Sequence, residues 1–158
     1  MLKKVLIANR GEIAVRIVRA CAEMGIRSVA IYTEPDRYAL HVKRADESYS
    51  LGDDPLAGYL DPLRIVNLAV ETGCDAIHPG YGFLSENAEF ARLCEKNNIT
   101  FVGPKSSVIE KMGDKTAARD SMRDAGVPIT PGSDGNLADL DEALALAEEV
   151  GYPVMIKA

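Results

Sequence analysis

Residues 21–32 read CAEMGIRSVAIY, and this stretch decides the fold because it passes from a helical pattern through one glycine into an apolar strand. The same succession recurs at 69–79 (AVETGCDAIHP), 122–130 (MRDAGVPIT) and 147–157 (AEEVGYPVMIK). Each glycine stands where a helix ends in the left-handed conformation, and these glycines are Gly25, Gly73, Gly126 and Gly151. Repeated helix–glycine–strand units predict an α/β fold, an open parallel sheet with crossover helices.

The strands themselves are short and mostly apolar, as expected where helices cover both faces of a sheet. We expect them at 4–8 (KVLIA), 28–32 (SVAIY), 75–79 (DAIHP) and 100–103 (TFVG), with a later strand at 152–156.

Two helix starts are readable. Asp61 precedes Pro62, which predicts a capping carboxylate followed by proline at the first helical position. Ser85 is expected to cap the helix that follows it in the same way. The first helix has one apolar stripe, predicted from Ile13, Ile17, Ala20, Cys21 and Met24.

The pattern changes after residue 103. A short helix ends near Gly113, Asp114 is placed to cap another helix, and VPITPGSDGN (127–136) follows as a Pro/Gly-rich loop. We therefore expect a domain boundary near residue 113, with one domain over 1–113 and a second beginning at 114. Two helices and one strand are too little for a separate core, so the sequence is expected to be truncated.

Composition argues against several classes of protein. The chain has 158 residues and a formal net charge of −6, with no cluster of lysines and arginines, which argues against a nucleic-acid partner. No apolar stretch approaches the roughly 18 residues of a membrane span. We expect no leader peptide, because the first strand begins too early to leave room for one. Cys21, Cys74 and Cys94 lack metal or disulfide spacing and are expected to be reduced and buried, which favours the cytoplasm.

Several segments could carry chemistry. The turn in LIANRGEIAVRI (6–17) is either structural or an anion site at a helix N-terminus. The loop of Gly80, Tyr81 and Gly82 follows a buried strand, where parallel sheets place ligands, although a structural turn stays open. We expect His78 to be a hydrogen-bonded structural residue, because no second metal ligand has suitable spacing.

Two pairs of charged residues also leave two interpretations open. Lys115 stands in the first turn of a helix and Lys157 ends a strand, so they either share an anion such as a polyphosphate or extend into solvent. Arg19 and Glu23 lie on a charged face of the first helix, which is either solvated or part of a self-complementary dimer surface.

The sequence as a whole resembles the N-terminal part of biotin carboxylases, the enzymes or domains found in acetyl-CoA, pyruvate and propionyl-CoA carboxylases. The segments that carry the resemblance lie in the family's order and include KKVLIANRGEIAVRIVRACAEMGI, AIHPGYGFLSEN, MGDK, AGVPITPGSDG and GYPVMIKA. It implies that residues 1–113 form a Rossmann-like pre-ATP-grasp domain and that 114–158 begin an ATP-grasp unit.

The resemblance also implies an activity. The full-length enzyme would use Mg²⁺ and ATP to activate bicarbonate and carboxylate biotin on a carrier protein, and carboxyltransferase subunits would accept the carboxyl group. Lys115 and Lys157 match ATP-binding lysines. Tyr81 and Gly82 match the biotin and bicarbonate side, and Arg19 and Glu23 match a homodimer contact. No catalytic residue or metal ligand is expected within these 158 residues, so the isolated chain should be inert. The alternatives are another ATP-grasp ligase resembling carbamoyl-phosphate synthetase, and a non-catalytic dimerising or scaffold module.

Overall fold

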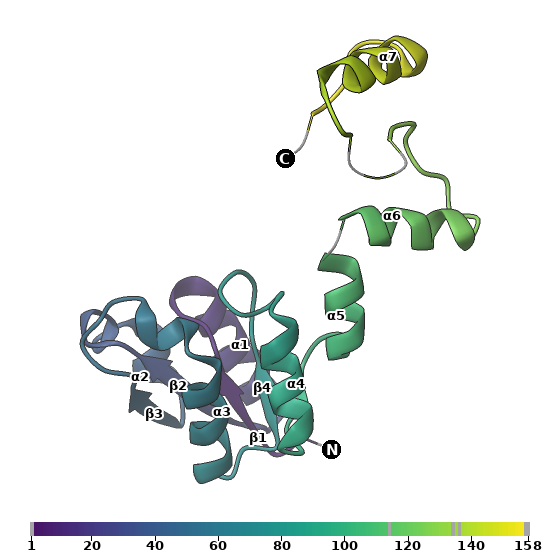
Figure 1. Ribbon diagram of the computed structural model, residues 1–158. Coiled ribbons are helices and arrows are strands. Elements are labelled where there is room, and N and C mark those ends of the chain that lie inside the picture. Colours follow the sequence, from purple (N-terminus) through teal and green to yellow (C-terminus); the bar gives the residue numbers. More distant parts are fainter. Residues whose placement is uncertain (1, 114, 134, 136, 157–158) are drawn as a thin grey trace. The chain divides into compact units, whose positions relative to one another are not determined.

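The computed structural model describes residues 2–113, 115–133, 135 and 137–156 (Figure 1). They form two compact units, a first unit of residues 1–110 and a second unit of residues 111–158. Among the described residues, no helix is both long and apolar enough to cross a membrane.

The first unit is built on a sheet of five strands in the order β3-β2-β1-β4-β5. The strands are β1 (Lys4–Ile7), β2 (Arg27–Tyr32), β3 (Glu47–Ser50), β4 (Ala76–His78) and β5 (Thr100–Phe101). Every neighbouring pair is parallel. The α/β fold and the four strands predicted in this unit are therefore confirmed. β3 was not predicted because its ESYS sequence alternates between half-buried and exposed side chains at the sheet edge.

Helices connect the strands and cover both faces. They are α1 (Gly11–Glu23), α2 (Leu40–Arg44), α3 (Pro62–Glu71) and α4 (Ala88–Lys96), with short 3₁₀ turns η1 (Glu34–Asp36) and η2 (Ala57–Leu60). After the last strand, α5 (Ser106–Gly113) runs across the boundary between the two units. Side chains of α1 pack with Val5 and Ile7 in one apolar cluster. Side chains of α3 and α4 pack with Leu6 and Val29 in a larger cluster. Because alternate residues of one strand enter different clusters, the sheet is doubly wound.

The apolar stripe predicted for α1 is partly wrong. Ile17 and Cys21 are buried as expected, but Ala20 and Met24 are exposed. The buried face instead comprises Ala14, Ile17, Val18 and Cys21. These four positions are spaced by three, one and three residues and share one side of the helix, whereas Ala20 lies off that side and Met24 follows the last helical residue.

Helix ends follow the predicted chemistry with one correction. Asp61 caps α3 by accepting a hydrogen bond from the Arg64 backbone N–H at 3.0 Å. Ser85 does not cap α4; Asn87 does, accepting from the Phe90 N–H at 2.8 Å. The four glycines predicted to follow helices, Gly25, Gly73, Gly126 and Gly151, all have positive φ.

All three cysteines are free and buried, as predicted. Burial raises the pKa of each thiol, in the case of Cys94 to about 12. These thiols therefore stay protonated and act as small apolar side chains.

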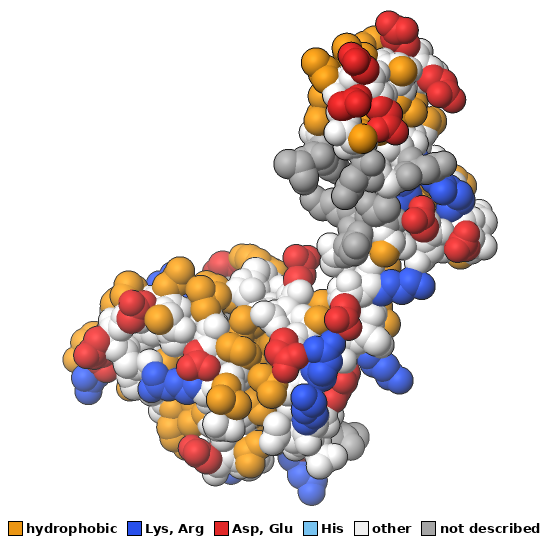
Figure 2. Space-filling view, in the orientation of Figure 1, with side chains coloured by type: hydrophobic (Ala, Val, Ile, Leu, Met, Phe, Trp, Pro, Cys, Tyr) orange, Lys and Arg blue, Asp and Glu red, His pale blue; other side chains and the backbone are white. Residues whose placement is uncertain are grey.

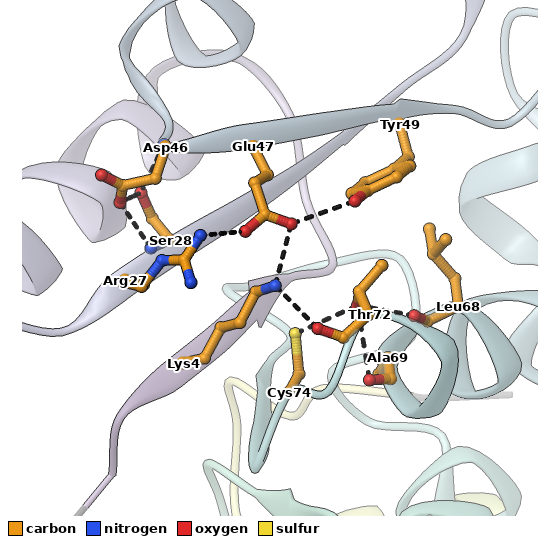
Figure 3. Close-up of polar contacts among 10 residues, drawn as sticks. All are labelled: Lys4, Arg27, Ser28, Asp46, Glu47, Tyr49, Leu68, Ala69, Thr72 and Cys74. Atoms are coloured by element: carbon orange, nitrogen blue, oxygen red, sulfur yellow. Dashed lines mark hydrogen bonds and ion pairs between the residues drawn. The ribbon is translucent and has the colours of Figure 1, made fainter.

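The amino ends of the strands are joined by a polar network around Glu47 (Figure 3). The ammonium of Lys4 donates to Glu47 Oε2 at 2.8 Å and to the Thr72 carbonyl at 2.7 Å. Arg27 and the Tyr49 hydroxyl also donate to the Glu47 carboxylate. Since hydrogen bonding from Lys4 lowers the pKa of Glu47, this edge is an ionised structural clamp between β1, β2, β3 and the end of α3.

The second unit contains α6 (Lys115–Asp124) and α7 (Leu140–Val150). The strand predicted at 152–156 is wrong for this structure, since those residues have no strand assignment, and Met155 and Ile156 are largely exposed. A strand needs a hydrogen-bonded neighbour, and the described part of this unit contains no other strand to pair with it.

Candidate functional site

The candidate site lies where the strand order reverses. β1 is flanked by β2 on one side and β4 on the other, so the loops that follow β1 and β4 leave the same edge of the sheet in different directions. Doubly wound sheets bind ligands at this carboxyl edge. The Ala8 N–H donates to the His78 carbonyl at 2.9 Å, which keeps the two strands paired up to the point where the loops begin.

Asn9 ties the two loops together. Its side chain is buried, and Nδ2 donates to the Pro79 and Tyr81 carbonyls at 2.8 Å each. Its Oδ1 accepts from the Arg10 backbone N–H at 2.9 Å. One amide group thus fixes the backbone on both sides of the switch point.

Gly80 permits this close approach. A Cβ placed there would lie 2.6 Å from Asn9 Nδ2, and the residue has φ +66°. Gly82 has φ +64°, but apart from its chain neighbours no heavy atom lies within 4 Å of its Cβ position, so a Cβ there would meet open space. Both glycines are required by backbone conformation, and only Gly80 is also required by packing.

Tyr81 stands between these glycines with 61% of its surface exposed. Its hydroxyl donates to Glu12 Oε1 at 2.6 Å, in the first turn of α1. This hydrogen bond and the negative charge of Glu12 raise the pKa of Tyr81, so the phenol stays protonated near neutral pH. The loop therefore presents an accessible aromatic face whose polar end is oriented by α1.

A partly buried ion pair lies behind the β1 loop. The Arg10 guanidinium donates from Nε and Nη2 to the two oxygens of Asp36, each at 2.5 Å. The Tyr59 hydroxyl donates to Asp36 Oδ2 at 2.8 Å. Hydrogen bonding from Arg10 holds the pKa of Asp36 below its usual range, while burial and the bond to Asp36 raise the pKa of Tyr59. The β1 turn is thereby anchored to η1 and η2.

The turn at the start of α1 had two interpretations, a structural turn or an anion site. In the structure, Arg10 at the N-cap is paired with Asp36, and Glu12 places a negative charge in the first turn. These contacts support the structural interpretation, because the neighbouring carboxylate opposes an anion there.

His78 is a structural residue, as predicted. Its Nδ1 accepts a hydrogen bond from the Gly80 N–H at 3.0 Å, and burial lowers its pKa. A neutral imidazole is consistent with both observations. Across the described part of the chain, no group of three or more histidine, cysteine or acidic side chains could hold a metal ion.

The other predicted site residues fall outside this loop. Lys115 is the first residue of α6, and its side chain is not among those the structure describes; Lys157 lies outside the described residues. Arg19 and Glu23 form an exposed pair on α1, with Arg19 Nε 2.7 Å from Glu23 Oε1. Acidic and basic side chains are interspersed over the visible face of the first unit (Figure 2).

Sequence reasoning singled out Tyr81 and Gly82 but not Asn9, Arg10 or Asp36. The available signal was a polar pair, Asn9 and Arg10, directly after a buried strand, and an acidic residue shortly after the next strand. Such residues at the carboxyl ends of parallel strands meet at one edge of the sheet.

Comparison with known proteins identifies the family. The model of the biotin carboxylase N-terminal domain matches residues 1–109. The model of the carbamoyl-phosphate synthase L chain ATP-binding domain matches residues 114–158.

Individual relatives agree with these matches. The 2-oxoglutarate carboxylase small subunit of Hydrogenobacter thermophilus is 60% identical, over all of this chain and 34% of that protein. Biotin carboxylase 1 of Bacillus subtilis is also 60% identical, over all of this chain and 35% of that protein. The biotin carboxylase of Pseudomonas aeruginosa is 57% identical, over all of this chain and 36% of that protein. The chain thus spans about a third of the length of these curated relatives.

Solved structures resemble the chain equally well. The biotin carboxylase domain of a thermophilic 2-oxoglutarate carboxylase bound to bicarbonate has a TM-score of 0.91 at 60% identity, covering all of this chain and 36% of its own. The dimer of the Hydrogenobacter thermophilus biotin carboxylase domain with MgADP, ADP and bicarbonate has a TM-score of 0.90 at 60% identity, covering 97% of this chain and 34% of its own. The resemblance inferred from the sequence is confirmed, and the chain belongs to the biotin carboxylase family.

Proposed function

We propose that the full-length protein containing this chain is an ATP-dependent ligase that carboxylates biotin on a carrier protein, using bicarbonate. The observation that supports this function is the Tyr81 loop, held by Asn9 at the switch point of a chain that is 60% identical to a biotin carboxylase. An exposed ring with a protonated hydroxyl suits a ligand that has an apolar ring system and a polar ureido group.

In this proposal Tyr81 and Gly82 contact the biotin and bicarbonate side. The Tyr81 ring provides an apolar surface, and its hydroxyl is oriented by Glu12. Gly82 leaves its Cβ position open, and a larger side chain there would take up space that the substrate could occupy. Neither residue has the chemistry to transfer the carboxyl group, so both act in binding and orientation.

The nucleotide belongs to the second part of the chain. We propose that residues 1–113 form the pre-ATP-grasp domain and that 114–158 begin the ATP-grasp domain, in keeping with the two family models that match 1–109 and 114–158. Lys115 and Lys157 would each supply a cation to the ATP phosphates. A structural relative binds MgADP and bicarbonate.

Metal ions and catalytic groups are assigned elsewhere in the full-length protein. The described residues offer no cluster of metal ligands, so Mg²⁺ would be held by residues beyond those described. The 158-residue chain alone should therefore release no ADP above background when it is given ATP, bicarbonate and biotin.

The proposed assembly is a homodimer in the cytoplasm, served by a biotin carboxyl carrier protein and carboxyltransferase subunits. A dimer is recorded for a structural relative. Arg19 and Glu23 are proposed as dimer contacts because both are exposed and carry opposite charges on one helix face.

Substitution of Tyr81 tests the function. In the full-length enzyme, Tyr81→Ala should raise the Michaelis constant for biotin severalfold. It should leave the constant for ATP unchanged, since Lys115 and Lys157, the residues proposed to bind ATP, are not altered. Tyr81→Phe keeps the ring and loses only the hydroxyl bond to Glu12, so it is the matched control and should have the smaller effect. An unaltered biotin constant in Tyr81→Ala would remove Tyr81 from the substrate site.

A further inference from the structure

Phe83 occupies an unusual backbone position beside the candidate site. It follows Gly82 directly and has φ 43°, a conformation that bulky residues rarely adopt. A residue held in this region needs surrounding contacts that compensate for the strain. The Tyr81 loop therefore depends on whatever holds Phe83.

The ring of Phe83 is stacked on Tyr59. The two ring centroids are 5.4 Å apart and the planes differ by only 6°. Tyr59 belongs to η2, which precedes α3, so this contact joins the loop after β4 to a distant part of the sequence.

Tyr59 is itself immobilised from several directions. It is 1% exposed, its hydroxyl donates to Asp36, and the Thr33 N–H lies 3.4 Å from its oxygen. The Arg10 guanidinium carbon lies 6.0 Å from its ring centroid. Phe83 therefore rests on a platform that an ion pair and a buried hydrogen bond keep in place.

The loop is consequently fixed at both ends, while its central side chain is exposed. Asn9 holds the Pro79 and Tyr81 carbonyls on one side, and the Tyr59 ring holds Phe83 on the other. Between these anchors, the Tyr81 hydroxyl is bonded to Glu12. We propose that Tyr59 and Phe83 are positioning residues that hold Tyr81 in its binding orientation, an inference that rests on the proposed role of Tyr81.

The expected effect on biotin binding is modest, because a single pair of stacked rings contributes little free energy. Losing the stack would lower the fraction of molecules with the loop in its binding conformation, and the apparent constant for biotin rises as that fraction falls. A rise of roughly two- to tenfold is expected for biotin, with no change for ATP.

The test uses the full-length enzyme with Phe83→Leu, Tyr59→Phe and a matched control. Phe83→Leu removes the stack, whereas Tyr59→Phe keeps the ring and removes only the hydroxyl bond. Phe101→Leu is the matched control, because Phe101 makes an edge-to-face contact with Phe90 in the core, outside the Tyr81 loop. Hydrogen exchange at residues 79–84 and steady-state kinetics with biotin and ATP varied in turn are measured for each.

We expect Phe83→Leu to exchange faster at 79–84, with unchanged exchange in the sheet strands, and to raise only the biotin constant. Tyr59→Phe keeps the stacked ring but loses the hydroxyl bond that helps to hold it, so it should raise the biotin constant less than Phe83→Leu does. Phe101→Leu should change neither substrate constant. If both leucine variants have the same lowered melting temperature but only Phe83→Leu raises the biotin constant, that rise comes from lost positioning and not from lost stability.

The two outcomes that matter are distinguishable. Unchanged exchange at 79–84 in Phe83→Leu would show that the stacking of Phe83 on Tyr59 does not hold the loop, whatever the substrate. Faster exchange with an unchanged biotin constant overturns its role in positioning, provided Tyr81→Ala weakens biotin. If Tyr81→Ala has no effect on the biotin constant, the proposed function of the loop fails instead. The exchange measurement alone then decides whether the stacking of Phe83 on Tyr59 holds the loop.

Discussion

The contact between Gly80 and Asn9 can be tested by a double-mutant cycle. Gly80→Ala has two costs: a Cβ at φ +66°, about 1–2 kcal/mol, and a Cβ 2.6 Å from Asn9 Nδ2, about 1–3 kcal/mol of overpacking. Gly82→Ala has φ +64° without a clash, so it measures the conformational cost alone and should lose about 1–2 kcal/mol.

Asn9→Ala removes the other partner. It deletes three hydrogen bonds from a buried side chain, two donated to carbonyls and one accepted from Arg10, worth about 0.5–1.5 kcal/mol each. The expected loss is about 2–4 kcal/mol. Asn97→Ala is its control, since the Asn97 side chain donates an exposed bond to the Leu93 carbonyl and should lose under about 1 kcal/mol.

Combining the two changes isolates the contact. With Asn9 shortened to alanine, the contacts of the added Cβ with Nδ2 at 2.6 Å and Cγ at 3.0 Å disappear, and only the Asn9 Cβ stays close, at 3.1 Å. Most of the overpacking is therefore relieved, and the conformational cost remains. The double variant should therefore be about 1–3 kcal/mol more stable than the sum of the single losses implies. Urea unfolding followed by circular dichroism measures each free energy. Losses that add to within about 0.5 kcal/mol would refute the close approach.

Three further outcomes are expected. Asp36→Asn should lower the free energy of unfolding by about 1.5–3 kcal/mol at pH 7. Because Arg10 lowers the folded-state pKa of Asp36, this stabilisation is present above the unfolded-state pKa of about 3.9 and is lost as the pH falls through the lower folded-state pKa. In urea unfolding, the difference in stability between the two proteins should therefore narrow below about pH 4, and a difference independent of pH would contradict the ion pair. In the full-length enzyme, Lys115→Gln or Lys157→Gln should raise the Michaelis constant for ATP about ten- to a hundredfold and hardly change that for biotin, since a charged hydrogen bond contributes about 1.5–3 kcal/mol. An unaltered constant for ATP would mean that the lysine extends into solvent and does not bind the nucleotide. Arg19→Glu should hardly alter the free energy of unfolding, because an exposed intrahelical ion pair contributes only about 0.3–0.5 kcal/mol. In sedimentation experiments the same change should weaken the dimer, and a full-length protein that is monomeric without any substitution would exclude the contact.

Much of the first unit could be predicted because its central strands are continuous apolar runs. β1, β2 and β4 are largely buried, and β2 and β4 each follow a helix and a glycine. β3 was not predicted because it is an edge strand, and an edge strand can form without a continuous apolar run. The cap of α4 was misplaced because Ser85 and Asn87 are both good capping residues, and only the backbone decides between them.

The candidate site was predictable only in part. Tyr81 and its glycines stand together in the sequence at the end of a buried strand. The contacts that hold them join residues 9, 10, 36, 59 and 83, which approach one another only once the strand order is known. The strand expected at 152–156 is absent because strand formation depends on a pairing partner as well as on apolar sequence.

The most direct test of the central claim is biotin-dependent ATP hydrolysis by the full-length protein. The purified enzyme is given Mg²⁺, ATP and labelled bicarbonate, with and without free biotin, and both ADP and acid-labile label on biotin are measured. ADP release that depends on biotin, with label transferred to biotin in equal amount, is the expected result. Bicarbonate-dependent ATP hydrolysis that is indifferent to biotin and leaves biotin unlabelled would contradict the assignment.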